Sequence, residues 1–212
     1  MGTLDSRGDN ARDETMSSTV HPPQVEAVDG RRQRGQDNRV RIVAAMMEIV
    51  REGQIAPSAE LVAARADVGL RTVFRHFQDM DSLYREMSVA IEAQLRAIMA
   101  RPLRGANGLD RFVELVGRRA LAFETIGPYR RAADAFRHRS RFLGADADRL
   151  AIEMRANLEQ ALPREIVGDR SRIEVLDLLM SFEAWSRLRR EQGLSLEAAQ
   201  SIVEAAVRRV IT

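Results

Sequence analysis

The sequence predicts an all-α protein of about nine helices, in which an N-terminal three-helix unit precedes a larger helical bundle. Apolar residues recur at spacings of three and four along most of the chain, which is the period of an amphipathic helix. No segment alternates polar and apolar residues over the length of a strand, and β-branched clusters are absent. Residues 57–77 also form two short helical segments around a three-residue break, which is typical of a helix-turn-helix.

Composition limits the class of protein. With 212 residues and 45% hydrophobic residues the chain can bury a substantial core, as one large or two modest domains. Cysteine is absent, which excludes disulfides and thiolate metal sites. No apolar run approaches the ~20 residues that span a bilayer, and the N-terminus lacks the apolar core of a signal peptide. We therefore expect a cytoplasmic protein without a membrane partner.

The basic residues are all arginines. The net charge is only +2, yet the isoelectric point is about 9.8 because the sequence contains no lysine. Arginine suits phosphate and guanine recognition through its planar guanidinium group. The codon usage of a GC-rich genome explains the lack of lysine more simply, so this feature alone does not indicate a nucleic-acid partner.

Residues 1–36 are predicted to form a disordered arm, because they are polar and lack sustained periodicity. The basic cluster 31–34 at its end either contacts DNA phosphates or the minor groove, or serves only solubility. Met16 is an alternative start of translation.

The first predicted helix covers 37–51 and ends before Gly53. Ser58 is expected to cap the next helix, a break follows at 66–68, and a second short helix covers 69–76. On that helix Val73 and Phe77 share a face that packs inward. The side chains left for a partner are Leu70, Arg71, Phe74 and Arg75.

Residues 38–85 resemble the N-terminal domain of TetR/AcrR-type transcriptional regulators. Many positions agree in order and spacing: Arg39, Ile42-Val43-Ala44-Ala45, Glu52-Gly53, Leu61-Val62-Ala63, Ala66, Val68, Thr72-Val73-Phe74-Arg75-His76-Phe77, Asp81 and Leu83. Four positions depart from that family's pattern: Asp67 replaces a turn glycine, Gly69 a capping serine, Phe74 a tyrosine and Met80 a lysine. The last two remove groups that contact DNA phosphates in the relatives, which affects affinity rather than fold.

The resemblance implies a DNA-binding domain at 37–83 and a ligand-sensing and dimerisation domain at 84–212. Arg71 and Thr72, with Leu70 and Phe74, are then expected to face base edges and sugar-phosphate. Phosphate contacts are expected from Arg75, His76 and Arg39. The full set of expected DNA-binding residues is Arg39, Ser58, Leu70, Arg71, Thr72, Phe74, Arg75 and His76.

The remaining periodicity predicts helices at 79–100, 109–126, 128–139, 142–162, 169–192 and 196–211. Asp79 and Ser195 are the expected N-caps of the first and last of these, and Gly127-Pro128 is expected to separate the second from the third. The helix at 79–100 is long enough to run roughly 30 Å from the DNA-binding unit.

The last two predicted helices are amphipathic and could either complete the core or pair with a second copy in a four-helix bundle. The resemblance favours a homodimer. The expected interface residues are Val175, Phe182, Val203 and Val210.

No motif for catalysis or for a cofactor is present. The three histidines lie far apart in the sequence, which argues against a metal site, and we expect neither an enzyme nor a bound cofactor. Aromatic residues gather between 112 and 185, where they form either plain core or the wall of a cavity for an unknown small molecule. The candidate ligand-binding residues are Phe112, Phe123, Tyr129, Phe136, Met154 and Trp185, with Arg130, Arg137 and His138 as polar anchors.

These inferences together predict a DNA-binding transcriptional regulator, a homodimeric repressor that a small hydrophobic effector releases from a double-stranded DNA operator. The alternative is a helical dimer in which DNA reading has degenerated and which acts as a protein-interaction module.

Overall fold

The computed structural model describes residues 25–212, with side chains from Gln33 onward except that of Arg139. The described residues form ten α-helices and contain no strand, which confirms the all-α class. None of the described helices combines the length and the apolar character needed to cross a bilayer. Residues Asp37–Thr212 form one compact unit, and the following description concerns that unit.

The first helix is longer than predicted. Helix α1 covers Val25–Arg51, so it begins twelve residues before the predicted start at Asp37 and includes part of the predicted arm. Residues 1–24 of that arm lie outside the described residues. The prediction relied on apolar periodicity, whereas 31–36 consist largely of Arg and Gln, which favour helix without an apolar stripe. The end of α1 at Arg51 is as predicted, and Gly53 follows with a φ of 103°.

The helix-turn-helix forms as predicted, with α2 at Ala59–Arg65 and α3 at Leu70–His76. The Ser58 hydroxyl accepts a hydrogen bond from the Leu61 amide at 3.3 Å, and this bond caps α2. Asp67 in the break has a φ of 51°, a left-handed conformation that Asp adopts more readily than most residues. Arg41 donates to the Asp67 carbonyl at 3.2 Å and to its carboxylate at 3.3 Å. These bonds explain how an aspartate stands where glycine is usual.

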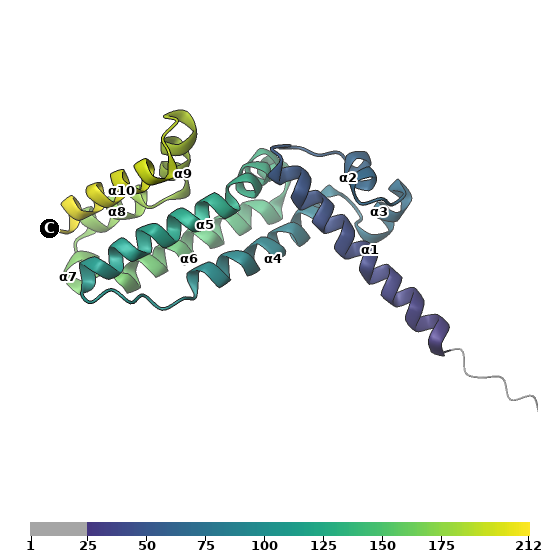
Figure 1. The fold of residues 1–212 in the computed structure, drawn as a ribbon, viewed down its shortest axis with the longest axis horizontal. Helices are drawn as coiled ribbons and strands as arrows, with labels where there is room; N and C mark the ends of the chain where they lie inside the picture. Colours follow the sequence, from purple (N-terminus) through teal and green to yellow (C-terminus); the bar gives the residue numbers. More distant parts are fainter. Residues whose placement is uncertain (1–24) are drawn as a thin grey trace, which may run out of the picture. The chain divides into compact units, whose positions relative to one another are not determined.

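Three long helices follow: α4 at Met80–Met99, α5 at Gly108–Phe136 and α6 at Arg141–Ala161. Asp79 and Ser82 form a reciprocal capping box at the start of α4, so the predicted N-cap is correct. Figure 1 shows α4, α5 and α6 running alongside one another, and α5 packs against both neighbours.

The predicted break at Gly127-Pro128 is wrong, because α5 continues through both residues and ends in a 3₁₀ turn at Arg137–Arg139. Proline in a helix interior costs ~3 kcal/mol. Buried side chains on both sides, Ile126 and Tyr129 among them, are held in the core and offset that cost.

The predicted helix at 169–192 is also wrong as a single element. It divides into α8 at Arg170–Leu179, α9 at Phe182–Ser186 and a π-helical turn at Arg187–Glu191, and the short α7 at Arg164–Val167 precedes it. Ser181 ends α8 and begins α9, because its hydroxyl accepts from the Ala184 amide at 3.1 Å and donates to the Leu178 carbonyl at 2.8 Å. The last helix, α10 at Leu196–Ile211, is as predicted, with Ser195 as its N-cap.

Two hydrophobic clusters hold the unit together. One joins α5 with α4, α6, α8 and α10. The other combines α1 to α4 with Tyr129 and Ala132 of α5 and Leu143 of α6. The second cluster crosses the predicted domain boundary at 83/84, so α5 and α6 contribute directly to the core of the helix-turn-helix region.

Candidate nucleic-acid interface and ligand pocket

Helix α3 presents two different faces. Val73 is 1% exposed and the adjoining Phe77 is 2% exposed, so both pack in the core as predicted. On the opposite face the side chains are accessible: Leu70 is 37% and Phe74 is 48% exposed, and Arg71 and Arg75 are exposed as well. A short helix with two exposed arginines and a buried apolar face can enter the major groove of DNA.

Arg39 lies elsewhere than its predicted role requires. Its guanidinium group donates to the His76 carbonyl at 3.0 Å, pairs with Glu86 at 2.6 Å and lies 4.6 Å from the centre of the Phe77 ring. These contacts connect α1 to the end of α3 and to α4. In this arrangement Arg39 helps to hold α3 in position, and its side chain is 35% exposed. Its phosphate contact stays a prediction.

His76 is also turned inward. Its Nε2 atom is buried without a hydrogen-bond partner, and burial, followed by the charges of Arg75 and Arg39, lowers its pKa. A neutral, buried imidazole nitrogen is a poor phosphate ligand. Of the remaining expected contacts, Thr72 is half-buried at the start of α3, and the Ser58 hydroxyl is used as the α2 cap.

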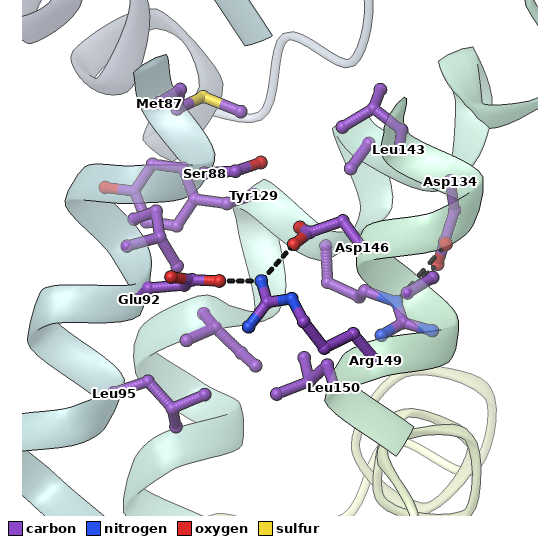
Figure 2. Close-up of a pocket in the computed structure, with 15 residues that line it drawn as sticks. Met87, Ser88, Glu92, Leu95, Tyr129, Asp134, Leu143, Asp146, Arg149 and Leu150 are labelled. Atoms are coloured by element: carbon purple, nitrogen blue, oxygen red, sulfur yellow. Dashed lines mark hydrogen bonds and ion pairs between the residues drawn. The ribbon is translucent and has the colours of Figure 1, made fainter. Parts of the chain in front are cut away.

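A hollow lies between α4, α5 and α6 (Figure 2). Its cavity volume is about 60 Å³, and its lining is apolar toward the inside, with charged side chains from all three helices. The lining residues are Met87, Ser88, Ile91, Glu92, Leu95, Ile126, Tyr129, Arg130, Ala133, Asp134, Leu143, Asp146, Ala147, Arg149 and Leu150. This volume is large enough for only a few water molecules, so a ligand of ordinary size fits only if side chains move.

The six predicted ligand residues do not converge on one cavity. Tyr129 lines the hollow described above, whereas Phe123 and Met154 line a second one of about 110 Å³ between α5, α6 and α9. Trp185 lines a third hollow together with Phe123, on the α9 side of α5, and donates from Nε1 to Glu124 at 2.9 Å. Phe112 is fully buried, and Phe136 stacks on Tyr84 with ring centres 4.9 Å apart. The aromatic residues therefore divide between core and separate cavities. Of the three predicted polar anchors, Arg130 lines the first and second hollows, whereas Arg137 and His138 are exposed.

Tyr129 connects the first hollow to the N-terminal helices. Its hydroxyl accepts a hydrogen bond from the Nε of Arg51, at the end of α1, at 3.2 Å. Its ring belongs to the same hydrophobic cluster as the inward face of α3. Tyr129 thus contacts both the hollow and the hydrophobic cluster that holds the helix-turn-helix.

Arg119 is a buried charge that the sequence analysis did not identify. Only 2% of it is exposed, and it donates to the carbonyls of Met180, at 2.8 Å, and Met154. Burial lowers its pKa to about 10, which leaves it protonated at neutral pH. Nothing in the sequence distinguishes it from neighbouring arginines, because its carbonyl partners lie in α6 and at the end of α8, 35 and 61 residues further along the chain.

Helices α8 and α10 pack together and leave apolar side chains in solvent. Leu178 is 67%, Ile202 47% and Val175 43% exposed. Val203 is 5% exposed and lies in the core of the protomer, so little of its side chain is accessible to a second copy.

Two other predicted interface residues are already used within the protomer. Phe182 contacts Phe123 with ring centres 5.7 Å apart, and Val210 packs against the core. Of the four predicted interface residues, Val175 is exposed, Phe182 and Val210 are half-buried, and Val203 is buried.

Among the described residues no group of three or more His, Asp or Glu side chains is placed to hold a metal ion. The chain matches no protein-family model and no curated protein sequence. Solved structures do match. A transcriptional regulator from Rhodococcus sp. RHA1 is 16% identical with a TM-score of 0.64, and the match covers 81% of this chain and 95% of that one. The chain has the fold of a transcriptional regulator.

Two further structures agree. The regulator SCO7518 of Streptomyces coelicolor A3(2) is 22% identical with a TM-score of 0.59, over 82% of this chain and 98% of that one. The multidrug binding protein EbrR, complexed with imidazole, is 20% identical with a TM-score of 0.60, over 82% and 94%. The matches extend across nearly the whole of each regulator, so the helical bundle is shared as well as the helix-turn-helix.

Proposed function

We propose that the protein is a DNA-binding transcriptional regulator of the TetR/AcrR type. The observation that carries this proposal is the two-sided α3, which buries Val73 and exposes Arg71, Arg75 and Phe74. The shared fold with regulators supports it. Arg71 and Thr72 at the start of the helix are the proposed base readers, and Arg75 is the proposed phosphate contact.

We further propose that the protein acts as a homodimer. One α3 reads only a single half-site, and two-fold related heads can read half-sites about 34–36 Å apart. The exposed apolar positions Val175, Leu178 and Ile202 on α8 and α10 support pairing of these two helices with their copies in a four-helix bundle.

Release by an effector is the proposed mode of control, with repression as the ground state. The hollow between α4, α5 and α6 supports this, because Tyr129 contacts both the hollow and Arg51. An effector that binds better to a conformation unable to bind the operator lowers DNA affinity by the same coupling free energy.

The test of DNA recognition is a mobility shift with the duplex that flanks the protein's own gene, followed by selection from random duplexes. We expect a palindromic site bound at least about a thousandfold more tightly than random DNA at physiological salt. Uniform affinity for all duplexes would contradict sequence-specific regulation.

The alternative is a helical dimer that has lost DNA reading and binds a protein. Two observations favour it. Phe74 is an exposed apolar side chain on α3. Met80 packs partly against the core, at a position where TetR/AcrR-type regulators usually carry lysine. A protein that dimerises but binds no duplex above background would support this alternative.

A further inference from the structure

Ion pairs connect charged residues that line the hollow between α4, α5 and α6. Figure 2 shows the Arg149 guanidinium group between Glu92 of α4 and Asp146 of α6. The side chain of Arg149 is 47% exposed, whereas those of Glu92 and Asp146 are 29% and 20% exposed. The cation thus lies nearer to solvent than the carboxylates that it joins. Its departure would leave Asp146 and Glu92 at the cavity, with Glu92 still paired with the exposed Arg96 at 3.8 Å.

The charges around the hollow favour a cation over an anion. Both lining arginines already have carboxylate partners: Arg130 pairs with Asp134 at 3.2 Å and with Glu183 at 3.4 Å, and Arg149 also pairs with Glu153 at 3.0 Å. An anionic ligand would compete with these carboxylates for each guanidinium group. A cationic ligand only has to replace one exposed arginine, whose side chain remains hydrated after it leaves.

The interior of the hollow suits an apolar body. Below the ion pairs the walls are formed by aliphatic and thioether side chains, namely Met87, Ile91, Leu95, Ile126, Leu143 and Leu150. Burying a hydrocarbon or aromatic group there removes apolar surface from water on both partners. The site therefore combines an apolar floor with an acidic rim.

Arg149 also lines a second hollow. The neighbouring one, between α4 and α6, measures about 240 Å³, and both are lined by Glu92, Leu95, Arg149 and Leu150. The volumes of the two hollows together come near the ~300 Å³ at which small-molecule sites begin.

We propose that the hollow between α4, α5 and α6 binds a cationic amphiphile, an apolar body carrying an ammonium group, whose charge replaces Arg149 between Glu92 and Asp146. The proposal names the chemical class of the effector and rests on the proposed function for its effect on DNA. Binding itself is independent of DNA. Because Glu92 lies on α4, exchange of Arg149 for a ligand also replaces an α4–α6 contact.

Arg119 does not provide a competing anion site. It lines the separate hollow of about 110 Å³, but its Nε is buried and its terminal nitrogens already donate to the Met154 and Met180 carbonyls. An anion would have to displace these backbone acceptors.

Calorimetric titration of the full chain with three matched probes tests the proposal: 4-phenylbutyltrimethylammonium, 4-phenylbutanol and 4-phenylbutanoate. The cation is expected to bind at least about tenfold more tightly than the alcohol, and the carboxylate most weakly. Glu92→Gln and Asp146→Asn should each weaken the cation about tenfold and leave the alcohol within about twofold. Arg149→Gln, which removes the competing guanidinium group, should strengthen the cation.

Asp148→Asn is the matched control, since Asp148 is exposed on the same helix and lines neither hollow. It should bind the cation like the unmodified protein, and thermal unfolding confirms that each variant folds. Equal binding of cation and alcohol, weaker cation binding by Arg149→Gln, or no binding of any probe at about 1 mM would overturn the proposal. A protein that binds an operator but no cation contradicts only this inference, and one that binds the cation selectively but no operator contradicts only the proposed regulation.

Discussion

Arg71 and Arg75 lie on the same short helix and are expected to contribute differently to DNA binding. Arg71→Ala should cost about 1–3 kcal/mol on the preferred site and relax base preference at one position. Arg75→Ala should weaken all duplexes alike and reduce the slope of log affinity against log salt by about one. Competition binding with a set of single-base operator variants measures both effects. Unchanged selectivity in Arg71→Ala would remove it as a base reader.

Tyr84 links alkaline stability to a single buried hydroxyl. Burial raises its pKa from 10.0 to about 12. Because the pKa is higher in the folded than in the unfolded protein, the protonated hydroxyl stabilises the folded state fully below pH 10. As pH rises from about 10 to 12, the free energy of unfolding falls by up to ~1.4 kcal/mol per pH unit. Tyr84→Phe should show a shallower loss in urea unfolding across that range.

Arg119 titrates in the same range with the opposite sign, because burial lowers its pKa to about 10. Both proteins retain Arg119, so the difference between their stability curves reports Tyr84 alone. Parallel curves would mean that the hydroxyl does not ionise with unfolding. The substitution also removes the 3.3 Å bond to the Ile55 carbonyl, which should lower stability by about 1 kcal/mol at neutral pH.

At the level of elements, α8 and α10 carry both core and exposed apolar positions. Leu178→Glu is expected to prevent dimer formation and specific DNA binding while the protomer keeps its helicity and its unfolding temperature. Val203→Glu is expected to destabilise the protomer itself by several kcal/mol, because it places an unpaired charge in the core. Sedimentation together with thermal unfolding separates the two outcomes. A Leu178→Glu protein that still sediments as a dimer would place the interface elsewhere.

The sequence predicts elements well where local signals decide. Ser58, Asp79 and Ser195 cap the helices that they were expected to cap, because an N-cap is a bond between neighbouring residues. The predicted break at Pro128 is wrong because burial of the neighbouring side chains outweighs the local cost of proline in a helix. The break at Ser181 has no signal in the apolar period, which continues across it, although the Ser181 hydroxyl bonds to Leu178 and Ala184 end one helix and begin the next.

The candidate sites were less predictable than the helices. The exposed face of α3 follows from helical period alone, whereas the inward position of Arg39 depends on Glu86 and His76, which lie distant in sequence. The six aromatic and Met residues predicted to form a pocket do not line a common hollow. The hollow between α4, α5 and α6 has a mainly aliphatic lining with charged residues of both signs, and it arises from helix packing, which composition does not specify.

For the whole molecule, Tyr129 is the proposed connection between ligand and DNA sites. Tyr129→Phe keeps the ring in the wall of the hollow and removes the hydroxyl that accepts from Arg51. We expect 4-phenylbutyltrimethylammonium to bind within about twofold of its normal affinity, while the factor by which it weakens operator binding falls by about fivefold. Operator titrations with and without the probe measure that factor. An undiminished factor would show that coupling follows another path, such as the Tyr84–Phe136 stack.

The hydrophobic cluster that Tyr129, Ala132 and Leu143 share with α1 to α4 limits how this protein can be recombined with others. A chimera that exchanges only residues 37–83 would place foreign side chains against the ends of α5 and α6. The exchanged segment and the remaining bundle would then each lose apolar contacts. The smallest transplantable head therefore includes two discontinuous segments of the bundle. Chimeras with proteins of the same fold are expected to fold only where these three positions keep compatible residues. A design that changes DNA specificity should therefore exchange the outward residues of α3 and leave its supporting core intact.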